Sequence, residues 1–150
     1  MTNEINELNI QIGNSFVDVI PSDFTDAWLY YSGGYGVTTT LWYCYKDKKL
    51  DKIIPADSIW DRKDVFIYDK NAYRLKTVKL MRTIVKTQKQ YLKNLNQKWY
   101  EMTFELDGSG KFNISFVYER PEGSLQERRE KWCIDHLGFV PVVKIEDLRR

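Results

Sequence analysis

The sequence predicts an α+β fold: an antiparallel β-sheet of about four to six strands, packed by an N-terminal helix, one long central helix and a C-terminal helix. Residues 99–119 alternate apolar and polar side chains on both sides of a glycine-rich turn, which is typical of a β-hairpin. Residues 71–95 instead place apolar side chains at helical spacing. No linker, repeat or low-complexity stretch divides the chain. We therefore expect one domain over residues 1–150.

The hairpin at residues 99–119 also predicts its own register. Both apolar sets share one face of the sheet only if facing residue numbers have an even sum, because side chains alternate with a period of two. A three-residue loop, Gly108-Ser109-Gly110, satisfies this condition. It places Leu106 opposite Phe112 and Asp107 opposite Lys111. Gly110 then takes the left-handed conformation of a bulged turn.

The N-terminal half predicts one helix and one further hairpin. Pro21 should end a helix over residues 4–20, whose apolar side consists of Ile5, Leu8, Ile12, Phe16, Val19 and Ile20. Residues 28–31 and 37–45 flank the turn Gly33-Gly34-Tyr35-Gly36 and indicate two strands. Short strands are also expected near residues 53–54 and 65–68.

Two helices are expected in the second half. The apolar side of the long helix should consist of Val78, Met81, Val85, Leu92 and Leu95. A capping box from Ser124 to Glu127 opens the last helix, and Gly138 ends it. The inward face of this last helix should hold Leu125, Trp132, Cys133 and Leu137.

Charge is segregated along the chain although the net charge is only +2. Residues 71–98 carry eight basic and no acidic side chains, and five of the basic ones share a face of the predicted helix: Lys79, Arg82, Lys86, Lys89 and Lys93. This basic stripe is either a solvated helix face or a surface for phosphates or an acidic protein. No aromatic residue interleaves it as a nucleic-acid stacking platform would, which disfavours direct nucleic-acid binding.

The sequence offers no catalytic constellation, so we expect no enzymatic activity, no cofactor and no metal. The single histidine, His136, lies near a predicted helix end, where a packing role or a favourable interaction with the helix dipole explains it. Cys44 and Cys133 lack metal-ligand spacing and are expected to be reduced core thiols. Glu101 and Glu105 are expected on a solvated strand face. Without a signal peptide or membrane-spanning run, the chain is expected to be cytoplasmic.

Several motifs along most of the chain are familiar. They are Ile20-Pro21-Ser22-Asp23-Phe24, Trp28-Leu29-Tyr30, Trp42-Tyr43, Trp99, Thr103, Gly110-Lys111-Phe112-Asn113, Phe116-Val117-Tyr118-Glu119, Arg129, Trp132, Leu137-Gly138 and Pro141. In these motifs the chain resembles the YezG-like family of bacterial immunity proteins. The resemblance implies a small cytoplasmic antitoxin without catalytic residues. Its partner would be a cognate toxin, typically a nuclease exported by a type VII secretion system.

Two surfaces are candidates for binding such a toxin. The first is the acidic segment within residues 47–69, because nuclease inhibitors commonly present acidic surfaces and aromatic anchors dominate interface energetics. Its candidate residues are Asp57, Trp60, Asp61, Asp64, Phe66 and Tyr68. The second is the basic stripe, against an acidic toxin surface away from the catalytic cleft. Glu119 and Arg120, where the chain leaves the 99–119 hairpin, form a further candidate rim. The alternative function is a nucleic-acid-binding module that uses the Lys79–Lys93 stripe.

Overall fold

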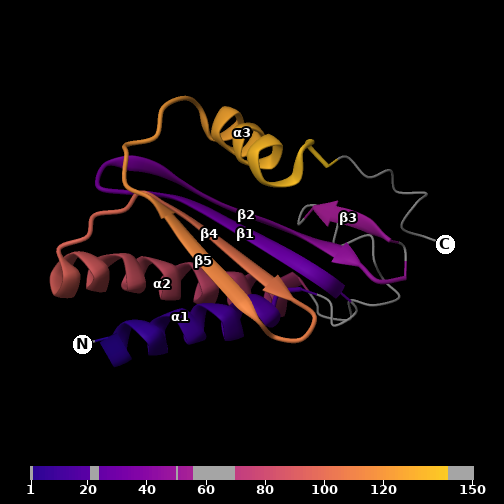
Figure 1. The fold of residues 1–150 in the computed structure, drawn as a ribbon, viewed down its shortest axis with the longest axis horizontal. Helices are drawn as coiled ribbons and strands as arrows, with labels where there is room; N and C mark the ends of the chain where they lie inside the picture. The colour runs from indigo at the N-terminus through magenta and orange to yellow at the C-terminus, as the bar shows by residue number, and fades with distance from the viewer. Residues whose placement is uncertain (1, 21–23, 50, 56–69, 142–150) are drawn as a thin grey trace.

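A computed structural model describes residues 2–20, 24–49, 51–55 and 70–141 of the chain, and it confirms the α+β class (Figure 1). In the described residues, five antiparallel strands form one sheet in the order β3-β2-β1-β4-β5. The elements are α1 (Thr2–Val17), β1 (Phe24–Gly34), β2 (Val37–Asp47), β3 (Lys52–Pro55), α2 (Lys70–Leu95), β4 (Glu101–Asp107), β5 (Phe112–Val117) and α3 (Leu125–Leu137).

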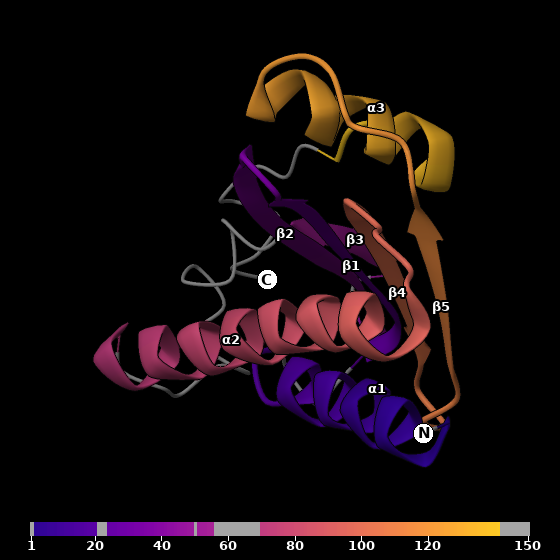
Figure 2. The same cartoon turned by 90° about the vertical axis from the view of Figure 1, so that its left-hand side faces the viewer.

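The sheet is the middle of three layers. Helices α1 and α2 cover one face, and α3 covers the other, as Figure 2 shows. Each strand of the hairpins turns alternate side chains toward these two layers, because successive residues of a strand point to opposite faces. The sheet therefore contributes to two separate apolar clusters, one under each helical layer.

The α1 side of the larger cluster agrees with the sequence prediction. All six predicted apolar residues of the N-terminal helix region are buried, although the helix ends at Val17 and the last two lie just beyond it. Phe16 packs edge-on against Tyr43 and Phe104 at ring-centroid distances of 5.8 and 6.1 Å. Gly13 allows this close approach, since a Cβ there would lie 3.2 Å from the Phe104 ring.

The predicted inward face of α2 is only partly correct: Met81, Val85 and Leu95 pack at the margin of the larger cluster rather than at its centre. Val78 is 39% exposed, and the other four predicted residues are only half-buried. The helix buries Tyr73, Leu80, Ile84, Thr87, Gln88 and Tyr91 instead. The prediction missed the aliphatic residues Leu80 and Ile84 as well as the threonine, glutamine and tyrosine side chains that complete this buried stripe.

Gln88 can be buried because its side-chain amide is fully used. Its Nε2 donates to the carbonyl oxygens of Gly33 at 2.9 Å and Trp99 at 2.8 Å. Its Oε1 accepts the Tyr31 hydroxyl at 3.0 Å. A buried polar group costs little when its hydrogen bonds are made. Gln88 therefore fixes α2 to the end of β1 and to the segment before β4.

The hairpin of β4 and β5 has the predicted register. Leu106 faces Phe112, and the Asp107 N–H donates to the Lys111 carbonyl at 2.9 Å. Gly110 has the left-handed φ of +92° that the bulged turn requires. The Asp107 carboxylate accepts the hydroxyl and N–H of Ser109 and the N–H of Lys111. These hydrogen bonds to its ionised form, that from the Ser109 hydroxyl foremost, lower the pKa of Asp107.

The first hairpin is longer and its turn tighter than predicted. The strands β1 and β2 each have 11 residues, and only Tyr35 and Gly36 separate them. Gly34 has a φ of +86°, and a Cβ there would lie 2.5 Å from Gln88 Oε1, so this position requires glycine. The strand expected near residues 53–54 is β3. The one expected at 65–68 lies outside the described residues.

Helix α3 begins and ends as predicted, at a Ser124 capping box and at Gly138. Trp132 and Cys133 are buried against the sheet as expected, and Leu137 packs against their cluster. Leu125, however, is 36% exposed, and the buried position in the first turns belongs to Arg128. The prediction was wrong because Arg128 finds polar partners on the sheet: its guanidinium donates to Ser32 Oγ at 2.6 Å and to the Thr38 carbonyl at 2.8 Å.

The polar face of β4 is not simply solvated, as the sequence suggested, because α3 covers part of it. The Glu101 carboxylate accepts the Tyr30 hydroxyl, and Glu105 Oε1 lies 4.0 Å from His136 Nδ1. Trp132 Nε1 donates to Thr103 Oγ1 at 2.9 Å. Burial, together with the Glu101 carboxylate, raises the pKa of Tyr30, so its hydroxyl remains a donor.

Candidate partner-binding surfaces

The acidic segment proposed from the sequence lies mostly outside the described residues. This holds for Asp57, Trp60, Asp61, Asp64, Phe66 and Tyr68. Two acidic residues at its start are described. Asp47 ends β2 and is buried, whereas Asp51 is exposed and its carboxylate lies 3.4 Å from Lys46 Nζ. Asp47 therefore has a place inside the fold rather than on a binding surface.

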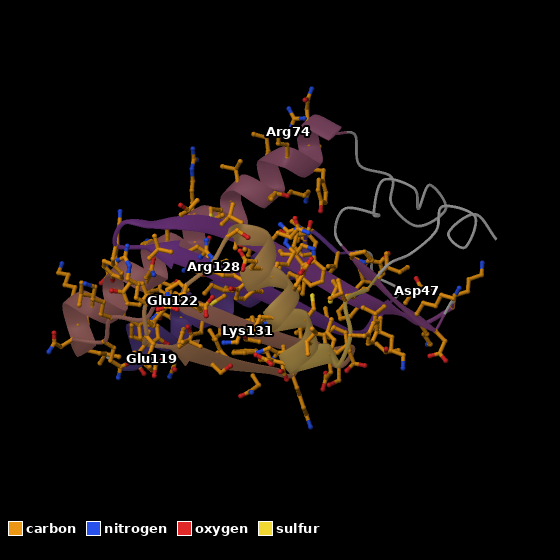
Figure 3. The ribbon with its side chains drawn as sticks, turned by 90° about the horizontal axis from the view of Figure 1, so that it is seen from above. Asp47, Arg74, Glu119, Glu122, Arg128 and Lys131 are labelled. Carbon is orange, nitrogen blue, oxygen red and sulfur yellow. The ribbon has the colours of Figure 1, made fainter. Side chains whose placement is uncertain are left out.

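Glu119 and Arg120 are both exposed, on the segment that joins β5 to α3; Glu119 is labelled in Figure 3. Arg120 reaches across to the tight turn between β1 and β2, where its Nη1 donates to the Tyr35 carbonyl at 3.2 Å. Tyr35 has a positive φ of 54°, which is uncommon for a residue with a side chain. Arg120, one of the two rim residues predicted from the sequence, is thus hydrogen-bonded to a turn that lies 85 residues earlier in the chain.

Lys98 and Tyr100 also contact Tyr35. We call the four residues Tyr35, Lys98, Tyr100 and Arg120 the turn cluster. The rings of Tyr35 and Tyr100 meet edge-on at 5.6 Å, and Lys98 Nζ lies 4.8 Å from the centre of the Tyr35 ring. Burial, and secondarily Tyr100, raises the pKa of Tyr35. Tyrosine and arginine are enriched at protein interfaces. Sequence reasoning missed Tyr35, although an aromatic residue between two glycines at a turn tip is a usable signal.

The basic stripe occupies the solvent side of α2. Lys79, Arg82, Lys86, Lys89 and Lys93 are all exposed, opposite the buried residues of the same helix. The turn cluster contributes two further exposed basic side chains, Lys98 and Arg120. The stripe is therefore sterically available to an acidic partner, and it equally fits a solvated helix face.

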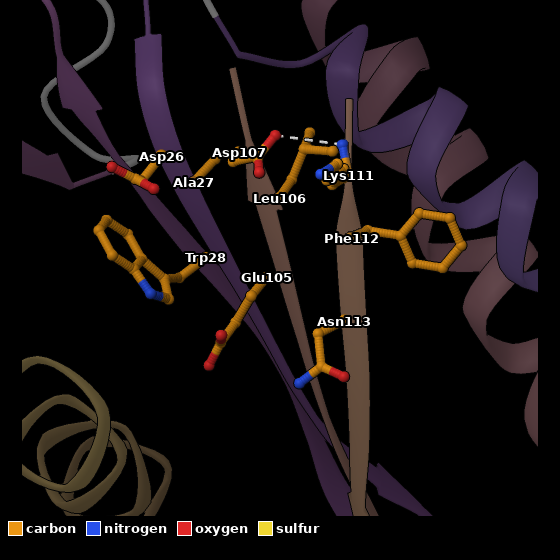
Figure 4. Close-up of a pocket in the computed structure, with 9 residues that line it drawn as sticks. All are labelled: Asp26, Ala27, Trp28, Glu105, Leu106, Asp107, Lys111, Phe112 and Asn113. Carbon is orange, nitrogen blue, oxygen red and sulfur yellow. Dashed lines mark hydrogen bonds between the residues drawn. The ribbon is translucent and has the colours of Figure 1, made fainter. Parts of the chain in front are cut away.

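A hollow of about 390 Å³ opens beside the β4–β5 hairpin, on the side of the sheet that α3 partly covers (Figure 4). Its charged groups are three carboxylates and one ammonium group, and Trp28 and Asn113 also face it. We call it the acidic hollow; its lining residues are Asp26, Ala27, Trp28, Glu105, Leu106, Asp107, Lys111, Phe112 and Asn113.

The histidine and the two cysteines, which are the side chains most suited to nucleophilic or metal chemistry, are packed against other side chains of the fold. His136 stacks on Trp132 with a ring-centroid distance of 4.8 Å. Cys44 and Cys133 are both buried, and burial strongly raises the pKa of the Cys44 thiol, which disfavours the reactive thiolate. Within the described ranges, no group of three or more histidine, cysteine, aspartate or glutamate side chains is arranged to hold a metal ion. None of the described helices is both long and apolar enough to cross a membrane.

Comparison with known proteins gives the family. The model of the family described as "Immunity protein YezG-like" matches residues 5–148. A relative from Bacillus spizizenii, named Immunity protein YezG, is 22% identical over 143 residues, which cover 93% of this chain and 86% of the relative. The match spans α1, the sheet, α2 and α3 rather than a single motif. The chain therefore belongs to the YezG-like family of immunity proteins.

Proposed function

We propose that this protein is a non-enzymatic antitoxin that binds and neutralises a cognate secreted toxin. The family match across residues 5–148 is the observation that supports the proposal most directly. The toxin is proposed to be a nuclease exported by a type VII secretion system, and the antitoxin to act in the cytoplasm of the producing cell. The buried cysteines and the stacked histidine favour inhibition by binding rather than by chemistry.

The first experiment tests the proposed function as a whole. The protein encoded by the neighbouring open reading frame is expressed alone and together with this protein. We expect toxicity alone, rescue on co-expression and a complex that co-purifies. DNA and RNA degradation by the purified toxin, with and without the antitoxin, then tests the nuclease assignment. Toxicity without rescue, together with no complex, would contradict the antitoxin role.

The toxin-binding surface is proposed to include the acidic residues Asp57, Asp61 and Asp64. Reversing all three to lysine should weaken binding to the toxin and change how binding depends on salt, because long-range attraction between opposite charges is screened. The matched variant reverses Lys79, Lys86 and Lys93 to glutamate on the basic stripe. If only the second variant loses affinity, the stripe rather than the acidic segment is the binding surface.

The runner-up function is nucleic-acid binding through the basic stripe, favoured by the exposure of all five of its side chains. It predicts affinity for duplex DNA or RNA that falls steeply with salt, since phosphate contacts release counterions. Fluorescence anisotropy with labelled 20-mers at about 50 and about 200 mM salt measures this slope. We expect no measurable binding at either salt concentration, whereas tight binding at about 50 mM that is largely lost at about 200 mM would favour the runner-up.

A further inference from the structure

The two edges of the sheet are protected very differently. At one edge, β3 has only four residues, begins with Lys52 and ends with Pro55. Short length, lysine and proline are devices by which proteins prevent another strand from pairing with an exposed edge. At the other edge, β5 has six residues, FNISFV, with no charge, proline or glycine. Its register with β4 is regular from Phe112 to Val117, because the bulge of the hairpin turn lies at Gly110, before the strand begins.

The backbone of β5 offers a template for one more strand. The hydrogen bond between Asp107 N–H and the Lys111 carbonyl fixes which pairs of the hairpin are hydrogen-bonded. Because such pairs alternate, Asn113, Ser115 and Val117 direct their N–H and C=O groups toward β4. The same groups of Phe112, Ile114 and Phe116 point away from the sheet. No strand in the described part of the chain pairs with them, and β5 lies along the outer side of β4 in Figure 2.

The side chains of β5 are also incompletely covered. Phe112 stacks on Phe104 at 5.0 Å yet remains 42% exposed, and Val117 is 46% exposed. Phe112, Ile114 and Phe116 share the face that α1 and α2 cover, since they alternate with the polar pair Asn113 and Ser115. A strand added beside β5 could therefore bury apolar side chains on that face.

The opposite face beside β5 carries the acidic hollow. Glu105 pairs directly with Asn113 across the hairpin, so it stands two strand spacings, about 10 Å, from any added strand. A lysine or arginine side chain lying over Asn113 would approach Glu105 and, beyond it, Asp26 and Trp28 (Figure 4). Three carboxylates against the single ammonium of Lys111 favour a basic occupant.

We propose that β5 binds an extended segment of the toxin as a sixth strand, and that this segment alternates apolar with basic side chains. Its apolar residues pack beside Phe112, Ile114 and Phe116, and its basic residues face the acidic hollow. This inference rests on the proposed antitoxin function. A second copy of the chain fits less well, because its own β5 would bring no charge and only the flanking Lys111 to the hollow. Six residues also bury less than a stable dimer needs.

The test uses the full chain and the toxin encoded by the neighbouring open reading frame. Ile114→Pro removes an outward N–H and leaves the inward hydrogen bonds to β4 in place. Ile114→Thr is the matched control, which loses apolar surface but keeps the N–H. We expect Ile114→Pro to weaken toxin binding at least about tenfold and Ile114→Thr about threefold or less. Circular dichroism and thermal melting establish that both variants are folded.

A second measurement needs no variant of β5. Hydrogen exchange of the wild-type protein should show the amides of Phe112, Ile114 and Phe116 exchanging rapidly in the free state and slowly in the complex. The amides of Asn113 and Ser115 should be protected in both states. For the hollow, Glu105→Gln with Asp26→Asn should reduce the salt dependence of binding. Glu7→Gln, on the exposed side of α1, should leave it unchanged.

The outcomes separate this proposal from the antitoxin function. If the toxin binds wild type and Ile114→Pro equally and the three amides stay unprotected, the strand proposal is wrong while the antitoxin function stands. If no toxin binds the wild-type protein, both are wrong. A dimer of the free protein that Ile114→Pro dissociates would assign the β5 edge to a second copy and overturn the proposal.

Discussion

The two faces of the sheet are packed by different chemistry. Under α1 and α2 lies a large cluster of aliphatic and aromatic side chains from both helices and four strands. Under α3 lies a small cluster of five buried residues, Tyr30, Trp42, Cys44, Trp132 and Cys133. Polar contacts surround the small cluster: Arg128 with Ser32, Trp132 with Thr103, and Tyr30 with Glu101.

This difference suggests that the two faces have different roles: one stabilises the fold and the other orients α3 on the sheet. Free energy from the hydrophobic effect grows with buried apolar area, so the α1/α2 face should supply most of the stability of the fold. The α3 face buries less apolar area and is oriented by hydrogen bonds whose net contribution to stability is modest. We therefore expect α3 to open locally at lower free energy than the rest of the molecule. Three substitutions test this division between the two faces and a fourth tests the β4–β5 turn, from the largest expected effect to the smallest.

Phe104→Ala should have the largest effect. Phe104 is fully buried between Phe16 and Phe112, and removing its ring leaves a cavity in the larger cluster. We expect a loss of about 3–5 kcal/mol in the free energy of unfolding, measured by urea denaturation. Phe104→Leu, which keeps much of the volume, should lose clearly less. A loss below about 1 kcal/mol for Phe104→Ala would contradict the assignment of stability to this face.

Gln88→Leu tests the polar contact within the same face. The leucine would leave the carbonyl oxygens of Gly33 and Trp99 and the hydroxyl of Tyr31 without the partners they now have. Leaving buried polar groups unsatisfied should cost about 2–3 kcal/mol of unfolding free energy. Gln126→Leu, at an exposed position of α3, is the control and should change stability by less than about 0.5 kcal/mol. Equal effects of the two would indicate that the Gln88 contacts contribute nothing.

Trp132→Phe tests the α3 face. The substitution keeps an aromatic ring against Tyr30, which stacks on Trp132 at 5.5 Å, but removes the hydrogen bond to Thr103. We expect a loss of about 1–2 kcal/mol, expressed mainly as faster hydrogen exchange of the α3 amides. Amides of β1 and α2 should exchange as in the wild type. Uniform acceleration across the whole molecule would show that α3 does not open on its own.

Asp107→Asn should have the smallest effect, and one that depends on pH. The pKa of Asp107 is lowered in the folded state, so its stabilising effect is present above the unfolded pKa of about 4 and is lost as the pH falls through the folded pKa. The wild type should therefore be more stable than Asp107→Asn at about pH 7, and the difference should vanish toward about pH 2. Urea denaturation across this range measures it, with Glu7→Gln as the control. A difference that persists undiminished in acid would contradict this explanation.

Some of the candidate binding surfaces could be anticipated from the sequence and others could not. The Lys79–Lys93 stripe is exposed as a single helix face because helical spacing alone places those residues together. The turn cluster could not be predicted in this way. Its members come from residue 35, residues 98–100 and residue 120, and only the folding of β1, β4 and the end of β5 into one sheet brings them together. The same applies to the acidic hollow, whose carboxylates lie on β1 and β4.

The sequence by itself determined the element types, the hairpin register and the α3 caps, because these depend on residues within a few positions of one another. Side-chain period, Gly110 and Ser124 were sufficient for them. Only the tertiary structure decided which side of α2 is buried and that an arginine, Arg128, occupies the buried side of α3. The partners that make Gln88 and Arg128 favourable inside the protein lie 55 and 96 residues away. Burial of a polar group depends on such distant partners, and no local pattern encodes them.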